Sequence, residues 1–177
     1  MIGFASGRIA AQTTLVSVAS YLAGFYFTDL FHAASASMGA LWSAVSGIVV
    51  LQATRRDTWS SASLRIFGSL IGAVTSAAYL SVLPFSPIGM AVSIFVTVLL
   101  CHVARIPDHA RLAAITVVVI MVITSIDPTL NPISNAALRF SESFIGATIA
   151  VFAALLWPES KEGPKDQPSA PLPDAQD

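Results

Sequence analysis

The feature that most constrains this chain is its long stretches without charge. Four apolar stretches contain no Asp, Glu, Lys or Arg, and in a fifth only Glu142 is charged. The charge-free stretches are 9–28, 30–54, 66–104 and 112–126, and the fifth is 140–158. A helix that crosses a bilayer needs about 20 mostly apolar residues, so these stretches predict membrane helices. The charged fraction of 11% agrees with this, because soluble domains carry about 25% charged residues.

The 66–104 stretch is too long for one crossing. The segment Pro84-Phe85-Ser86-Pro87 divides it into two helices. The apolar pattern then predicts six helices, at about 9–29, 36–53, 62–83, 87–104, 110–126 and 135–157. The expected fold is an all-α integral membrane protein with six transmembrane helices.

The basic residues of the N-terminus, connections and tail gather on one side of this topology. The N-terminus, the second and fourth connections and the tail contain Arg8, Arg55, Arg56, Arg105, Arg111, Lys161 and Lys165. The alternate connections, at about 30–35, 84–87 and 127–134, contain neither Lys nor Arg. By the positive-inside rule we expect a multi-pass protein of the cell (inner) membrane with both termini cytoplasmic. A cleaved signal peptide ending near Ala34-Ser35-Ala36 is the disfavoured alternative, because the first apolar stretch exceeds the usual length of about 7–15 residues.

An internal repeat relates the two halves of the chain. The segment that begins at Leu64 recurs as the segment that begins at Leu138, and both apolar stretches end at a proline. The identical pairs are Leu64/Leu138, Arg65/Arg139, Ser69/Ser143, Ile71/Ile145, Gly72/Gly146, Ala73/Ala147 and Pro84/Pro158. Because each half has an odd number of helices, the halves must cross the membrane in opposite directions, as in many secondary transporters. We therefore expect a 3+3 inverted repeat.

The chain divides into one membrane domain and a tail. Residues 1–157 form the predicted transmembrane domain, with halves at about 9–83 and 87–157. Residues 158–177 contain five prolines and seven charged residues. That composition predicts a disordered cytoplasmic tail.

Arg65 and Arg139 are the strongest candidates for function. An arginine at the centre of a spanning helix costs about 2.5–3.5 kcal/mol, and charges inside a membrane usually mark a substrate or ion path. Each arginine lies only a few residues inside its predicted helix, so anchoring at the membrane surface is the competing interpretation. A guanidinium is permanently charged and binds a carboxylate through two parallel hydrogen bonds. Two arginines at opposite mouths of one path would therefore attract an organic anion from either side.

Glu142 lies three residues after Arg139, on the same helical face. One interpretation is a local ion pair that lowers the cost of burying Arg139. The other is a carboxylate that releases the arginine when it takes up a proton, which would couple anion movement to a proton gradient. The sequence leaves both interpretations open.

Small and polar residues accompany these charges. Gly68 and Gly72 have the Gly-x-x-x-Gly spacing, and Gly146 repeats the second position. Small residues at this spacing let helices approach closely, so we expect a packing role. Trp42 and Ser46, on the second predicted helix, are candidates to line a substrate cavity or to bond across helices, and the sequence leaves both interpretations open.

No motif for catalysis is present. The sequence lacks a P-loop, a nucleophile elbow and a His-Glu-x-x-His pair. His32, His102 and His109 are scattered, which is a poor basis for a metal site. The basic residues form no continuous stripe for nucleic acid. We expect no enzymatic activity, no cofactor, no metal and no nucleic-acid partner.

The block from Leu41 to Gln52, followed by Arg65-x-x-Gly68-x-x-x-Gly72-Ala73, resembles the fusaric acid resistance and aromatic acid exporter family. That family has a Trp-Ala start to its second helix and Arg-x-x-Gly-Thr-x-x-Gly-Ala at the opening of its third. Ser43 and Ser69 replace the family's Ala and Thr here. The resemblance covers about residues 5–157.

The resemblance implies a six-helix inverted-repeat domain that exports organic anions such as aromatic carboxylates. Plant aluminium-activated malate transporters look similar, and they work as dimers whose anion pore is lined by arginines that correspond to Arg65 and Arg139. Larger family members carry a cytoplasmic domain and often a second membrane domain, and neither occurs in this sequence. We therefore expect the chain to pair with itself as a homodimer.

Together these patterns predict a membrane transporter or exporter of small organic anions in the lipid bilayer. The expected substrate-binding residues are Arg65, Arg139, Glu142, Trp42 and Ser46. A passive anion channel and a non-transporting scaffold subunit are the alternatives. A scaffold would tolerate neutral replacements of both arginines but not a change such as Gly72→Leu.

Overall fold

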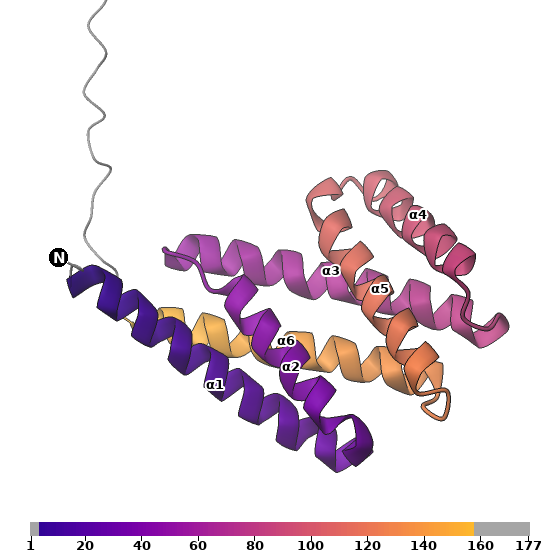
Figure 1. The fold of residues 1–177 in the computed structure, drawn as a ribbon. Coiled ribbons are helices and arrows are strands. Elements are labelled where there is room, and N and C mark those ends of the chain that lie inside the picture. Colours follow the sequence, from indigo (N-terminus) through magenta and orange to yellow (C-terminus); the bar gives the residue numbers. More distant parts are fainter. Residues whose placement is uncertain (1–3, 158–177) are drawn as a thin grey trace, which may run out of the picture.

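The computed structural model describes residues 4–157, which form six α-helices, two short 3-10 helices and no β-strand (Figure 1). The α-helices are α1 (Phe4–His32), α2 (Ala36–Val50), α3 (Arg55–Val82), α4 (Pro87–Val103), α5 (Ala110–Ile126) and α6 (Pro132–Leu156). The 3-10 helices are η1 (Ala33–Ser35) and η2 (Pro107–His109). The all-α prediction is confirmed. The predicted tail at 158–177 lies outside the described residues.

Helix α3 begins at Arg55, so the expected start near residue 62 is wrong. The Thr54 side chain accepts a hydrogen bond from the Asp57 backbone N–H and donates one to the Asp57 carboxylate. These bonds satisfy backbone and side-chain groups at the helix start, as an N-terminal cap does. The polar residues after Arg55 therefore belong to the helix and not to a connection.

Helix α6 also begins earlier than expected. The Asn131 side chain accepts hydrogen bonds from the backbone N–H groups of Ile133 and Ser134, and Pro132 occupies the first helical position. A proline there suits the helix, because its fixed φ is helical and the first N–H needs no helical partner. Ser86 and Pro87 start α4 in the same way, as the sequence predicted.

Four helical segments among the described residues are long and apolar enough to cross a membrane: Gly7–Val50, Arg55–Val82, Pro107–Ile126 and Pro132–Leu156. The first segment contains both α1 and α2, which fold back on each other through η1 (Figure 1). Helix α2 has 15 residues, or about 22 Å at 1.5 Å per residue. A hydrocarbon core is about 30 Å thick. The chain is thus a multi-pass membrane protein by its helices, and six full crossings stay a prediction.

Helices α3 and α6 form a central antiparallel pair (Figure 1). Helix α2 packs on α6, and α5 packs on α3. Helix α1 covers α2 and α6, whereas α4 lies outside against α5 and α3. This arrangement brings α2, α3, α5 and α6 around the middle of the molecule, where both candidate arginines lie.

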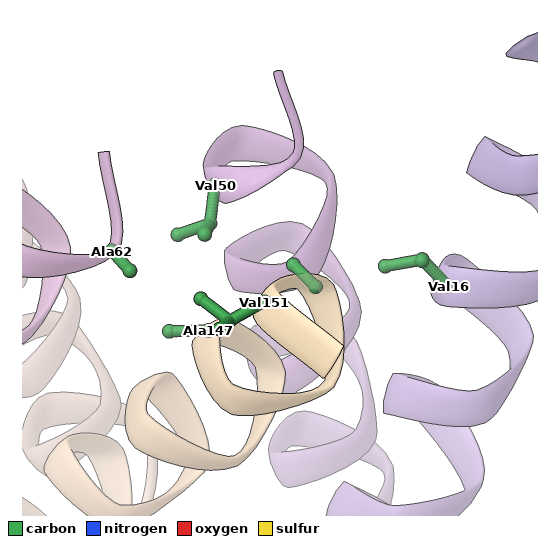
Figure 2. Packing of buried hydrophobic residues seen from close by; sticks show 6 residues of the cluster. Val16, Val50, Ala62, Ala147 and Val151 are labelled. Carbon is green, nitrogen blue, oxygen red and sulfur yellow. The ribbon is translucent and has the colours of Figure 1, made fainter. Parts of the chain in front are cut away.

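Small apolar side chains hold these helices together. One buried cluster joins Val16 of α1, Val50 of α2, Ala62 of α3 and Ala147 and Val151 of α6 (Figure 2). A second cluster joins α3, α5 and α6 around Ile120 and Met121. Large apolar side chains such as Tyr26, Phe95 and Phe152 are exposed instead, as expected for a surface that faces lipid.

Candidate functional site

Arg139 is fully buried and forms an ion pair within α6. Its Nη2 lies 2.8 Å from Glu142 Oε1, and both side chains have 0% exposure. Thr28 of α1 donates a hydrogen bond to the same carboxylate oxygen at 2.7 Å. Gly39 of α2 is in close contact, because a Cβ at Gly39 would collide with Thr28 Oγ1. Three helices thus enclose the Glu142 carboxylate.

Arg65 is buried in a different environment, with 1% exposure. Its Nε and Nη2 donate to Ser46 Oγ of α2 at 3.2 and 2.9 Å. Its guanidinium carbon lies 4.5 Å from the ring centroid of Trp42, within the range of a cation–π contact. The structure therefore brings Arg65, Trp42 and Ser46 together, as a group of three predicted site residues.

The expectation that each arginine lies only a few residues inside its helix is wrong for Arg65. Because α3 begins at Arg55, Arg65 lies about 15 Å along the helix from its first residue. Both guanidinium groups point into the protein, where Arg65 binds Ser46 and Arg139 binds Glu142. Neither side chain extends over the molecular surface, so the interpretation as surface anchors is also wrong.

A cavity of about 260 Å³ opens between α2 and α5. Helix α2 contributes Met38, Leu41 and Trp42, α6 contributes Arg139, and α5 contributes five aliphatic side chains between Val118 and Ile126. The surface that this cavity exposes is apolar, and the buried side chains of Arg139 and Trp42 border it. An amphipathic anion, with an apolar body and a charged end, has the matching chemistry.

Hydrogen-bond donors at this cavity lack acceptors. Among the described residues, Trp42 Nε1 and Arg139 Nε and Nη1 are buried without a hydrogen-bond partner. Buried polar groups are nearly always satisfied, so each such group calls for an explanation. Buried donors without acceptors, on side chains that border one cavity, are suited to bind the oxygen atoms of a carboxylate.

The three predicted packing glycines lie at close helix contacts. A Cβ at Gly72 would collide with the Ala113 carbonyl oxygen of α5, and a Cβ at Gly146 would collide with the Ser43 carbonyl oxygen of α2. A Cβ at Gly68 would lie 3.0 Å from Leu112 Cβ. Each of these glycines thus lies where a neighbouring helix approaches closely.

Asp127 ends α5, just after the cavity residue Ile126. Its Oδ1 accepts hydrogen bonds from the Thr129 hydroxyl at 2.5 Å and the Thr129 backbone N–H at 3.1 Å. These bonds, chiefly the one from the hydroxyl, hold the pKa of the Asp127 carboxyl below its usual value. The connection from α5 to α6 therefore carries a negative charge at neutral pH.

Thr28 and Asn135 are buried polar residues that were not singled out from the sequence. Thr28 binds Glu142, and Asn135 donates to the Ile120 carbonyl and to Thr124 Oγ1 of α5, at 3.0 Å each. A lone threonine near the end of an apolar helix carries no sequence signal. Asn135 carries one, because an amide side chain inside a predicted membrane helix needs partners from another helix. No group of three or more His, Cys, Asp and Glu side chains suited to a metal occurs within residues 4–157.

Comparisons with known proteins identify the family. A family model described as "Fusaric acid resistance protein-like" matches residues 15–153, which include all the site residues above. No curated protein and no solved structure matches the chain. Since the family model covers most of the sequence, the chain belongs to the fusaric acid resistance protein-like family, a family of membrane transport and resistance proteins.

Proposed function

We propose that this protein transports small organic anions, such as aromatic carboxylates, across the cell (inner) membrane. The single observation that carries the proposal is the apolar cavity between α2 and α5, which is bordered by the buried side chains of Arg139 and Trp42. A buried guanidinium without a full set of acceptors attracts an anion, and the aliphatic wall suits an apolar ring. Membership of the fusaric acid resistance protein-like family supports this function.

The two halves are proposed to be an inverted repeat. The packing supports this, because each contact between two α-helices has a counterpart when α1, α2 and α3 are matched to α4, α5 and α6. Helix α2 packs on α6 as α5 packs on α3, and α1 packs on α2 as α4 packs on α5. Gly72 meets α5 as Gly146 meets α2. An inverted repeat provides two related states, each open to one side of the membrane.

Glu142 is proposed to supply proton coupling. Its Oε1 binds Arg139 and Thr28, whereas its Oε2 is buried without a hydrogen-bond partner among the described residues. Protonation at Oε2 would neutralise the carboxylate and free the Arg139 charge for a substrate anion. Anion binding and proton binding would then support each other.

We also propose how the chain is oriented and assembled in the membrane. Both termini are proposed to lie in the cytoplasm, and the one-sided distribution of basic residues in the sequence supports this. The partner of each chain is proposed to be a second copy, because the cavity between α2 and α5 reaches the surface at the exposed residues Leu41 and Val122. A two-fold dimer would enclose it.

Flux in liposomes tests the function. Purified protein would be reconstituted, and uptake of a labelled aromatic carboxylate measured with and without an imposed pH gradient. Arg139→Gln removes the charge at the cavity and keeps hydrogen-bonding capacity. Arg111→Gln, at an exposed position, removes an arginine elsewhere and is the matched control.

We expect the flux to need Arg139 and not Arg111, and to accelerate when the pH gradient is imposed. A flux that follows the anion gradient alone would indicate a passive channel. If well-folded protein gives no flux above protein-free liposomes with several organic anions, the transport proposal is wrong. A scaffold subunit would then be the better interpretation.

A further inference from the structure

We propose that Trp42 is a gate between the cavity and Arg65, so that an anion at Arg139 reaches Arg65 only after the Trp42 side chain moves. The inference rests on the proposed function, because it divides the same anion path. It adds which side chain lies between the cavity and Arg65.

The position of Trp42 carries the inference. Trp42 lines the cavity together with Arg139, and its ring lies 4.5 Å from the Arg65 guanidinium carbon. Arg65 is not among the residues that line the cavity, and its exposure is 1%. The indole therefore borders the cavity and also covers Arg65.

The contacts of Trp42 allow it to move. Its Nε1 is buried without a hydrogen-bond partner among the described residues, so a change of rotamer breaks no hydrogen bond of the indole. Attraction between the ring face and the guanidinium holds the side chain in place. A carboxylate that pairs with Arg65 makes a stronger, charge-assisted contact, so it can replace the ring.

Arg65 stays in position when the ring leaves. Its Nε and Nη2 are both held by Ser46 Oγ of α2. The guanidinium is therefore already oriented when an anion arrives, and only the indole has to turn. In this arrangement the Trp42 side chain moves, whereas the side chains of Arg65 and Ser46 stay in place.

Reactivity of introduced cysteines tests the gate without any measurement of transport. In a Cys101→Ala background, Ser46→Cys places a thiol behind Trp42 at a fully buried position, and Met38→Cys places one on the cavity wall. Protein in nanodiscs would be treated with a small anionic methanethiosulfonate reagent, and the labelling rate followed by mass spectrometry. Each probe would be combined with Trp42→Ala, Trp42→Val and Trp42→Phe.

With Trp42 present, we expect the thiol at position 46 to react at least about tenfold more slowly than the thiol at position 38, because reaction needs a transient opening. Trp42→Ala and Trp42→Val should bring its rate close to that of position 38. Trp42→Phe keeps an aromatic ring over Arg65 and should keep it slow. Only variants that elute as a single species with unchanged helical circular dichroism would be compared.

Two results would overturn the gate. Equal labelling of positions 46 and 38 with Trp42 present would mean that no barrier exists. Slow labelling of position 46 in a well-folded Trp42→Ala or Trp42→Val protein would mean that another group forms the barrier. Because labelling does not depend on substrate movement, a failed flux assay with a positive labelling result would reject the transport proposal and retain the gate.

Discussion

At the residue scale, the ion pair of Arg139 and Glu142 is costly to bury and is also a candidate substrate site. We predict that Glu142→Gln destabilises the protein by about 3–5 kcal/mol, because it leaves the Arg139 charge buried without a counter-charge. The Gln side-chain oxygen still accepts the hydrogen bond from Thr28, so the change isolates the charge. Thermal unfolding in detergent, followed by circular dichroism, measures the effect.

The double variant Arg139→Gln/Glu142→Gln is the control for this charge effect. Replacing both partners removes the uncompensated charge, so we expect the double variant to regain much of the stability that the single variant loses. An unfolding temperature of Glu142→Gln equal to that of the unchanged protein would show that Arg139 finds another counter-charge, and would contradict the prediction.

Residue identity alone located the charged part of the site but not its surroundings. Arg65, Arg139 and Glu142 are conspicuous because charge is rare in apolar stretches. Thr28 and Gly39 are not conspicuous, because threonine and glycine are common in membrane helices. Their contact with Glu142 depends on how α1 and α2 cross α6, which no local pattern encodes.

At the scale of elements, the glycines set how closely neighbouring helices approach. We predict that Gly146→Ala and Gly72→Ala each destabilise the protein by about 1–3 kcal/mol through overpacking, since the added methyl group meets a backbone carbonyl of another helix. The unfolding temperature measures this loss. Gly7→Ala is the matched control, because no atom lies within 4 Å of a Cβ there.

Gly7→Ala also separates helix propensity from packing. Alanine has a better helix propensity than glycine by about 1 kcal/mol, so Gly7→Ala should leave stability unchanged or slightly raise it. If all three substitutions raised the unfolding temperature alike, propensity would outweigh packing. The close approach of α2 to α6 and of α5 to α3 would then be unnecessary for stability.

The residue after the end of α4 that has a left-handed backbone is an arginine and not a glycine. Arg105 has φ of 60°, a left-handed conformation that glycine adopts without strain. Its N–H donates to the His102 carbonyl, and the Ile106 N–H donates to the Cys101 carbonyl, which is the Schellman pattern at a helix end. We predict that Arg105→Gly stabilises the protein by about 1 kcal/mol, measured as a higher unfolding temperature.

Ala104→Gly serves as the comparison for this helix end. Ala104 has φ of −72° and ψ of −1°, so glycine relieves no strain there and only adds freedom to the unfolded chain. It should lower stability slightly. A stabilisation by Ala104→Gly as large as that by Arg105→Gly would remove the left-handed conformation as the cause.

The sequence predicted the existence and type of the helices better than their ends. The charge-free stretches correspond to α1, α2, α3, α4 and α5, and the prolines at 84 and 87 separate α3 from α4. The starts of α3 and α6 were predicted too late because hydropathy alone defined them. Thr54 with Asp57, and Asn131 with Pro132, are capping signals in the sequence that would have moved both starts toward the N-terminus.

At the scale of the whole molecule, the arrangement of helices goes beyond what hydropathy encodes. An apolar helix surface does not distinguish a neighbouring helix from lipid, because both are apolar. The central pairing of α3 and α6 was therefore not predictable from the apolar pattern. The repeat of Arg65 as Arg139 indicated equivalent roles for α3 and α6. That signal comes from residue identity and not from the apolar pattern.

Two copies of the chain are expected to assemble around the cavity between α2 and α5. A homodimer that covers the cavity between α2 and α5 should have twice the monomer mass in a nanodisc or mild detergent. Leu41→Cys and Val122→Cys, each introduced alone in a Cys101→Ala background, should form a cross-link between copies, because both exposed residues border the cavity. Tyr26→Cys, on the exposed surface of α1, should not cross-link in the same background.

A monomeric mass together with full anion flux would contradict this assembly, since one copy would then suffice for the path. A dimeric mass with cross-linking through Tyr26→Cys alone would place the two-fold axis at α1, away from the cavity. In that case each copy would have its own path, and the lateral opening between α2 and α5 would face lipid. The cross-linking pattern thus decides whether two copies share one anion path or carry two.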